Sequence, residues 1–365
     1  MDKKFFMGIA AMAALTLVSC SSDDLNSLSD NSSKNEAISF DGYLGRSAVA
    51  VNGSRGSVVD IKALQESTEG FGVFGNYSST TEGTTPAYGN SLFNNQQVTY
   101  DKTKSKWTYS PLRFWPTQGH IDFLAYAPYD SKYNNTVTKD NQKLTFIVDS
   151  NITNQKDLLY ANAVGQTKDG ISSTGNKVKF QFAHALSRLG YSVKLKDASY
   201  ESVATITLNK ITLAGSTTEP TQNAFYIKGT IDLSTGNWST ASSNDAKQNF
   251  EWFDNKTSGD KTLSNNEVIK NPDNEYLFVI PQDFSTGNAN ADQLYVIVEY
   301  TVSYNGGVKA TVPYKVSQQL TNNFEKGKAY TINLTIGLTP IEFNAAVTDW
   351  VDAKNPINDI PVTWN

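Results

Sequence analysis

The side chains best suited to acid–base chemistry or zinc binding are the two histidines, His120 and His184. Neither belongs to a His-x-x-x-His or cysteine-containing spacing that gathers zinc ligands. The chain also lacks a Gly-x-Ser-x-Gly turn, a phosphate-binding loop and a dinucleotide-binding glycine pattern. Carboxylate pairs for glycoside hydrolysis meet only in three dimensions, and nothing in the sequence nominates one. We therefore expect hydrogen-bonding roles for both histidines, and no enzyme activity, metal or cofactor.

The only cysteine, Cys20, has a thiol that can be acylated. A start with two lysines precedes an apolar run, and the ending Leu17-Val18-Ser19-Cys20 resembles a bacterial lipobox, whose cysteine is joined to diacylglycerol before the preceding peptide bond is cut. The run is shorter than the roughly 20 residues that span a bilayer. We expect residues 1–19 to be a lipoprotein signal peptide and Cys20 the lipidation site, with a transmembrane helix or an unlipidated signal as alternatives.

Length and composition point to two exported β-rich domains. The chain has 365 residues, and domains of about 100–200 residues are usual. Aromatic residues make up 12% and charged residues 18%, a mixture that favours strands. The net charge of −5 gives no basic footprint for nucleic acid.

The pattern along the chain indicates where these domains begin and end. Residues 20–35 are polar and read as a flexible tether. Period-two alternation then predicts short strands from Glu36 to the C-terminus, among them one over residues 224–233. A Gly/Ser/Thr-rich loop places a boundary near residue 180. We expect antiparallel β-sandwiches over residues 36–180 and 181–365. Val58–Ser67 has helical spacing and could instead form one or two helical turns.

Three aromatic residues lie in a polar stretch of the second half: Trp238, Trp252 and Phe253. Exposed aromatic rings stack on sugars, so these side chains are candidates for a glycan site. The alternative is that they pack over the end of a sandwich.

Several segments, in this order and spacing, resemble the fimbrillin family, the lipoprotein pilins of Bacteroides-type bacteria. With the lipobox, the resemblance spans nearly the whole chain. The segments are WTYSPLRFWP (107–116), DFLAYAP (122–128), FAHALSRL (182–189), YTINLTI (330–336) and VTDW (347–350).

This resemblance implies two tandem transthyretin-like β-sandwich domains and assembly by strand exchange. In such pilins an Arg-specific protease removes the first strand, and the open groove accepts a strand from a neighbouring subunit. We expect cleavage between Arg46 and Ser47, with Arg55 and Gly56 as the second candidate site. The alternative is that both are ordinary loop arginines.

The donor strand is expected within residues 343–365. Ile360, Val362 and Trp364 alternate there and would share one face, unless the tail folds back on its own domain. The predicted function is that of a structural pilin, an outer-membrane lipoprotein precursor that matures into a surface fimbrium with other pilin subunits and a host or bacterial receptor as partners. The alternative is a surface glycan-binding lipoprotein, or a tip adhesin that does not polymerise through its C-terminus.

Overall fold

Strands dominate the part of the chain that the computed structural model describes. Its helices are short: α1 (Ile61–Glu66), α2 (Tyr200–Val203), α3 (Asn255–Ser258) and three 3-10 turns (Ser131–Tyr133, Ile152–Asn154, Ser172–Thr174). In these residues no helix is long and apolar enough to cross a membrane. The described residues are 36–44, 61–78, 90–138, 141–217, 222–240, 247–259, 261–265, 267–272, 275–287, 292–306, 311–338, 342–349 and 359–360.

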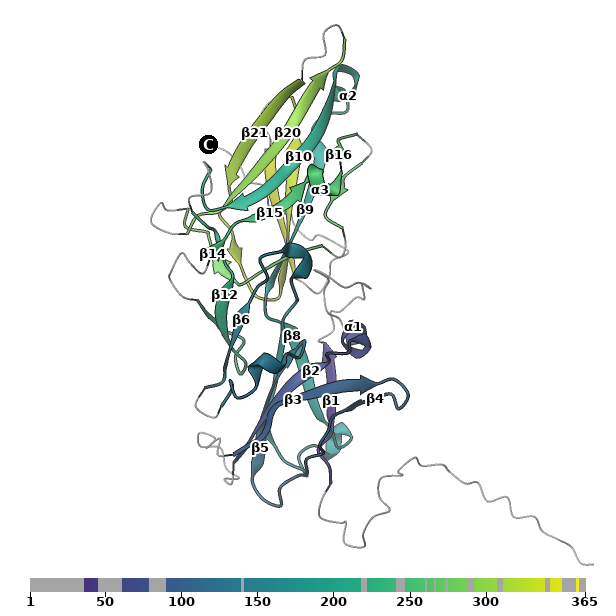
Figure 1. Ribbon diagram of the computed structural model, residues 1–365, viewed down its shortest axis with the longest axis vertical. Helices are drawn as coiled ribbons and strands as arrows, with labels where there is room; N and C mark the ends of the chain where they lie inside the picture. The colour runs from purple at the N-terminus through teal and green to yellow at the C-terminus, as the bar shows by residue number, and fades with distance from the viewer. Residues whose placement is uncertain are drawn as a thin grey trace, which may run out of the picture.

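The N-terminal half forms a seven-stranded sheet in the order β1-β8-β7-β5-β2-β3-β4. The two end strands, β1 and β4, also contact each other, so the sheet curls around its apolar face (Figure 1). A cluster rich in phenylalanine fills the enclosed space. The strands are β1 (Phe40–Leu44), β2 (Phe71–Ser78), β3 (Asn90–Asp101), β4 (Lys106–Thr108), β5 (His120–Ala127), β7 (Leu159–Gln166) and β8 (Val178–His184).

In the C-terminal half two sheets enclose a second core. One sheet has the order β15-β10-β20-β21, with β16 also on β10, and the other β17-β9-β23-β24-β25, with β18 also on β9. Their strands are β9 (Ser187–Leu195), β10 (Ala204–Ala214), β15 (Phe250–Asp254), β16 (Lys261–Thr262), β17 (Ile269–Lys270), β18 (Leu277–Val279), β20 (Tyr295–Tyr304), β21 (Thr311–Gln319), β23 (Lys328–Ile336), β24 (Glu342–Asp349) and β25 (Asp359–Ile360).

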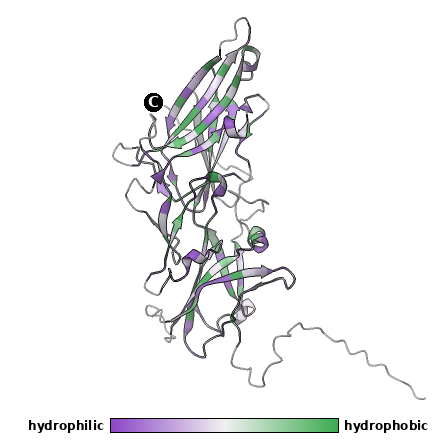
Figure 2. Cartoon of the chain, in the orientation of Figure 1, coloured by the Kyte–Doolittle hydropathy of each residue, from purple (hydrophilic) through white to green (hydrophobic). Residues whose placement is uncertain are grey.

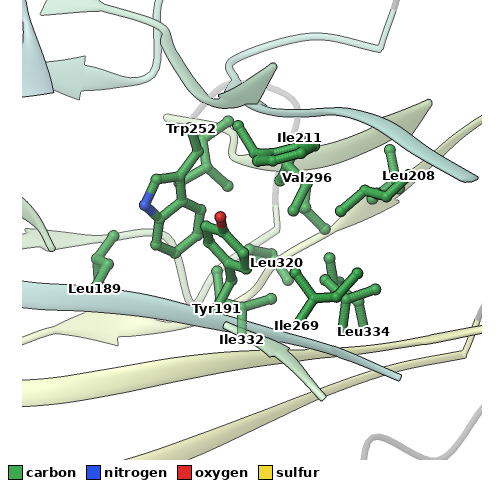
Figure 3. Close-up of a cluster of buried hydrophobic side chains, with 14 of the residues drawn as sticks. Leu189, Tyr191, Leu208, Ile211, Trp252, Ile269, Val296, Leu320, Ile332 and Leu334 are labelled. Carbon is green, nitrogen blue, oxygen red and sulfur yellow. The ribbon is translucent and has the colours of Figure 1, made fainter. Parts of the chain in front are cut away.

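Side chains from both sheets meet in this second core. Figure 3 shows Tyr191 of β9 and Ile332 of β23 opposite Ile211 of β10 and Val296 of β20. Along the strands, hydrophobic and hydrophilic residues alternate (Figure 2). The alternation therefore predicts most strands correctly, because most of them bury one face, whereas the central strands β2 and β5 are buried on both.

A third apolar cluster joins the two halves. It combines side chains such as Phe146 and Ile231, whose strands β6 (Lys143–Ile147) and β12 (Lys228–Asp232) pair in a sheet with β13 (Trp238–Thr240). The predicted boundary near residue 180 stays a prediction, but main-chain pairing crosses it here. The strand expected over 224–233 is divided at Ile227, whose carbonyl accepts a hydrogen bond from Val148. The remaining short pairs are β11 (Phe225–Tyr226) with β14 (Lys247–Gln248) and β19 (Gln282–Asp283) with β22 (Asn323–Phe324).

Among the described strands two pairs are parallel, which differs from the expected antiparallel sandwiches. They are β1 with β8, and β9 with β23. In each case more than a hundred residues separate the partners along the chain. Hydrophobic alternation shows which face of a strand is buried but not the direction of its partner, so the parallel pairing could not be predicted from the sequence pattern.

Candidate functional site

The first described strand, β1, fills the centre of the N-terminal core although it lies at the end of its sheet. Phe40 and Gly42 are buried, whereas Tyr43 points outward and is 43% exposed. The Phe40 ring is 2% exposed. Four aromatic rings surround it at centroid distances of 5.4–5.6 Å: Phe93, Tyr109, Phe123 and Phe180.

The main chain of this segment is held on two sides. Residues 40–44 pair in parallel with residues 178–182 of β8. Before them, the Ile38 amide donates to the Arg113 carbonyl at 2.8 Å, and the Trp115 amide donates to the Glu36 carbonyl at 3.1 Å. Residues 36–44 are therefore one continuous segment whose first part bonds to residues 113–115 and whose second part bonds to β8.

A tyrosine hydroxyl also holds this segment. Tyr109 donates to the Ile38 carbonyl at 2.7 Å, and the same hydroxyl accepts from the Arg113 amide at 3.3 Å. Burial raises the pKa of Tyr109, so the phenol keeps the proton that it donates.

Gly42 sets a steric limit within β1. A Cβ at this position would lie 3.2 Å from Cε2 of Phe182 and 3.7 Å from Cε1 of Phe71. A methyl group needs only a small adjustment there, but a large side chain does not fit. A strand in this place must therefore carry, two residues apart, a large aromatic group and a small residue.

Removing residues 36–44 would create a binding site for an extended peptide. The β8 edge would offer unpaired main-chain groups, and the space left by Phe40 would be lined by aromatic rings. Such a groove binds a strand by main-chain hydrogen bonds and selects it by alternate side chains. Such a groove would act by recognition alone and would not need a reactive group.

The predicted processing sites lie largely outside the described residues. This applies to Cys20, Arg46, Ser47, Arg55, Gly56, Val362 and Trp364. Of the predicted donor residues only Ile360 is described, as part of β25, where it pairs with Ala345 of β24.

The two histidines lie apart, each beside one carboxylate. His184 Nδ1 lies 2.9 Å from Asp157 Oδ2 at the end of β8, and His120 Nε2 lies 3.5 Å from Asp122 Oδ2. Within the described residues no three potential metal-ligating side chains gather. His184 thus has the intramolecular hydrogen bond expected of it, whereas the His120–Asp122 distance is long for a hydrogen bond.

The aromatic residues considered for a glycan site pack inside the protein. Trp252 and Phe253 are 8% and 5% exposed, and Trp252 packs edge-on against Tyr191 (Figure 3). Trp238 packs edge-on against Phe146 and donates its indole N–H to the Ala185 carbonyl at 2.7 Å. The glycan-site interpretation is therefore wrong for Trp252 and Phe253, because their side chains are buried, whereas Trp238 is half-buried.

Sequence reasoning missed a feature that the β1 geometry makes visible. Residues 38–44 read ISFDGYL, and residues 341–347 read IEFNAAV. Both have isoleucine, phenylalanine, a small residue and an aliphatic residue at alternate positions, which is the inward pattern of β1. The match was available in the sequence, but the tight space around Gly42 is what gives it meaning.

Comparison with known proteins agrees with this architecture. A model of the family described as fimbrillin-like matches residues 59–350. Fimbrium subunit Fim1C of Phocaeicola vulgatus is 27% identical, over 94% of this chain and 96% of its own. The crystal structure of a fimbrial protein from Bacteroides vulgatus shares the fold, with a TM-score of 0.60, 21% identity and coverage of 86% of this chain and 99% of its own. The family model covers well over half of the sequence, and the chain belongs to the fimbrillin-like family.

Proposed function

We propose that this protein is a fimbrial subunit that polymerises by strand exchange at the groove occupied by β1. Its family and its similarity to a fimbrium subunit support the fimbrial role. The observation that carries the exchange mechanism is that β1 holds a core aromatic residue, Phe40, yet lies at the end of its sheet. A strand of that kind leaves a hydrophobic groove when it departs.

The sequence before β1 accounts for delivery of the protein, and the sequence after β1 accounts for its maturation. Residues 1–19 direct export, and Cys20 carries the lipid that holds the precursor at the outer membrane. An Arg-specific protease then cuts after Arg46, or after Arg55. Both arginines lie between β1 and α1 in sequence, so either cut separates β1 and the lipid from the remaining chain.

The donor segment is residues 341–347 of another copy, inserted parallel to β8 as β1 is. In the structure residues 342–349 form β24, which is paired with β23, so donation requires β24 to leave that sheet. In this register Phe343 takes the place of Phe40, and Ala345 the place of Gly42. The reverse direction would bring Phe343 to the confined Gly42 position. Placing Ile360 in the Ile38 position puts Trp364 there instead, so the 360–364 tail fits less well in the parallel direction.

A specific pair of substitutions tests the donor. The full chain is treated with an Arg-specific protease, and polymer ladders are followed by gel electrophoresis with intact-mass analysis of the cut. Phe343→Asp should abolish the ladder, whereas its neighbour Asn344→Asp should not. Because Phe343→Asp leaves the acceptor groove intact, mixing it with the parent chain should shorten the polymers.

Other outcomes would contradict parts of the scheme. Resistance of both Arg46 and Arg55 would contradict the maturation step. Ladders unchanged by Phe343→Asp but lost on deletion of residues 351–365 would assign donation to Ile360, Val362 and Trp364. Cleavage without any ladder would indicate a subunit that does not polymerise through its C-terminus.

A further inference from the structure

Arginine is scarce in this chain, and its distribution is uneven. Of the 31 lysines and arginines only four are arginine: Arg46, Arg55, Arg113 and Arg188. The first two lie between β1 and α1 in sequence. The other two lie in described elements, where an Arg-specific protease would meet very different surroundings.

Arg188 is protected by its place in the fold. Its side chain is 6% exposed, and the guanidinium lies 4.3 Å from the centroid of the Tyr276 ring. Its main chain is paired on both sides, with Phe278 of β18 and Ala329 of β23. A protease binds an extended, accessible main chain, so Arg188 requires extensive unfolding before it can be cut.

Arg113, unlike Arg188, has an exposed side chain. Its side chain is exposed, and so are those of Leu112 and Phe114, at 47% and 48%. Its main chain, however, is covered by the segment that leads into β1, because the Arg113 carbonyl accepts from Ile38 and the following Trp115 amide donates to Glu36. The Arg113 side chain, which an Arg-specific protease recognises, is thus accessible. The main-chain groups beside the bond to be cut, however, are engaged in hydrogen bonds.

We infer that the Arg113–Phe114 bond is a second, conditional cleavage site, masked by residues 36–38 and uncovered when β1 leaves. This inference rests on the proposed maturation of the protein by an Arg-specific protease. Departure of the β1 segment removes the hydrogen bonds of Ile38 and Glu36 and releases the Tyr109 hydroxyl from the Ile38 carbonyl. The 113–115 main chain is then free to pair with the substrate cleft of the protease.

Cleavage here is ordinary peptide hydrolysis. Water adds to the Arg113 carbonyl carbon, the bond to the Phe114 nitrogen breaks, and a carboxylate on Arg113 and an ammonium group on Phe114 result. The cut severs one wall of the acceptor groove. In the register proposed above, residues 339–341 of an incoming donor take the place of residues 36–38 and cover this main chain. The site therefore inactivates matured subunits that have not received a donor.

The test uses full-length chains in which cleavage between β1 and α1 is blocked by Arg46→Lys and Arg55→Lys. An Arg-specific protease should leave this parent uncut at Arg113. Adding Phe40→Ala, which weakens β1 docking, should accelerate cleavage after Arg113 at least tenfold, as measured by intact-mass time courses. Adding Tyr43→Ala on the outward face of the same strand is the matched control and should have no effect.

Two further measurements separate unmasking from general misfolding. An excess of a synthetic peptide of residues 36–44 should restore the slow rate in the Phe40→Ala chain, whereas a misfolded chain would not respond. Arg113→Lys should remove the product. Equal rates with and without Phe40→Ala, or no protection by the peptide, would overturn the inference. Failure of the maturation step alone appears separately, as lack of cleavage at Arg46 and Arg55 in the unsubstituted chain.

Discussion

Replacing Phe40 by alanine should loosen β1 far more than any change on its outward face. The ring is 2% exposed, with four aromatic rings within 5.6 Å. Truncating a buried phenylalanine usually costs about 3–5 kcal/mol, because burial is lost and a cavity remains. At about 1.4 kcal/mol per tenfold change, the population with β1 undocked should rise a hundredfold or more. Tyr43→Ala, on the exposed face, should change stability by about 0.5 kcal/mol or less.

Amide hydrogen exchange measures this difference directly. Exchange followed by mass spectrometry should show faster exchange in residues 178–182 of Phe40→Ala, since β1 pairs with β8 there. The guanidinium midpoint of unfolding should fall in the same variant. Equal exchange rates in β8 for Phe40→Ala and Tyr43→Ala would refute the view that Phe40 anchors the strand.

Three other perturbations test the junction and the second core. Trp238→Phe deletes the donor to the Ala185 carbonyl and should lower the urea-unfolding free energy by about 1–3 kcal/mol. Gly236→Ala should also destabilise, by about 1 kcal/mol or more, because φ is +68° and a Cβ would collide with the Tyr160 ring. Burial raises the pKa of Tyr191 to about 12, so its stabilising contribution is complete below pH 10 and is lost as pH rises through 12. The slope of unfolding free energy against pH between 10 and 12 should be shallower in Tyr191→Phe.

Each of these three expectations has an outcome that contradicts it. Unchanged stability of Trp238→Phe would mean that the indole hydrogen bond contributes nothing net. Gly236→Ala should recover partly when Tyr160 is also reduced to alanine, and the absence of recovery would exclude a steric cause. An identical alkaline slope in Tyr191→Phe would assign the pH dependence to other buried tyrosines, such as Tyr126 and Tyr330, whose pKa values burial also raises.

The aromatic residues show where sequence reasoning stops. The alternation around Phe40 predicts a strand, whereas Trp252 lies in a polar stretch of the sequence, yet both side chains are buried in strands. Only the packing reveals that Trp252 is covered by Tyr191, which removes it from any sugar site. Whether a ring faces solvent or a second sheet depends on segments distant along the chain, and local periodicity carries no information about them.

The expected strand over residues 224–233 is divided at Ile227 for a similar reason. Alternation predicted one strand across residues 224–233, and the local pattern is right on each side of the break. The chain instead passes from β11, which pairs with β14, to β12, which pairs with β6. Between them the Ile227 carbonyl accepts a hydrogen bond from the Val148 amide. Pairing with a partner from the other half of the molecule overrides a continuous local preference.

The sequence by itself determined the strand content, the family resemblance, and the presence of a phenylalanine and a small residue two positions apart in both 38–44 and 341–347. These follow from local side-chain type and spacing. Tertiary structure alone decided that β1 runs parallel to β8, that Gly42 faces Phe182, and that residues 36–38 cover Arg113. Such relations join segments 70 or more residues apart, and they arise from pairing and packing that no short-range pattern encodes.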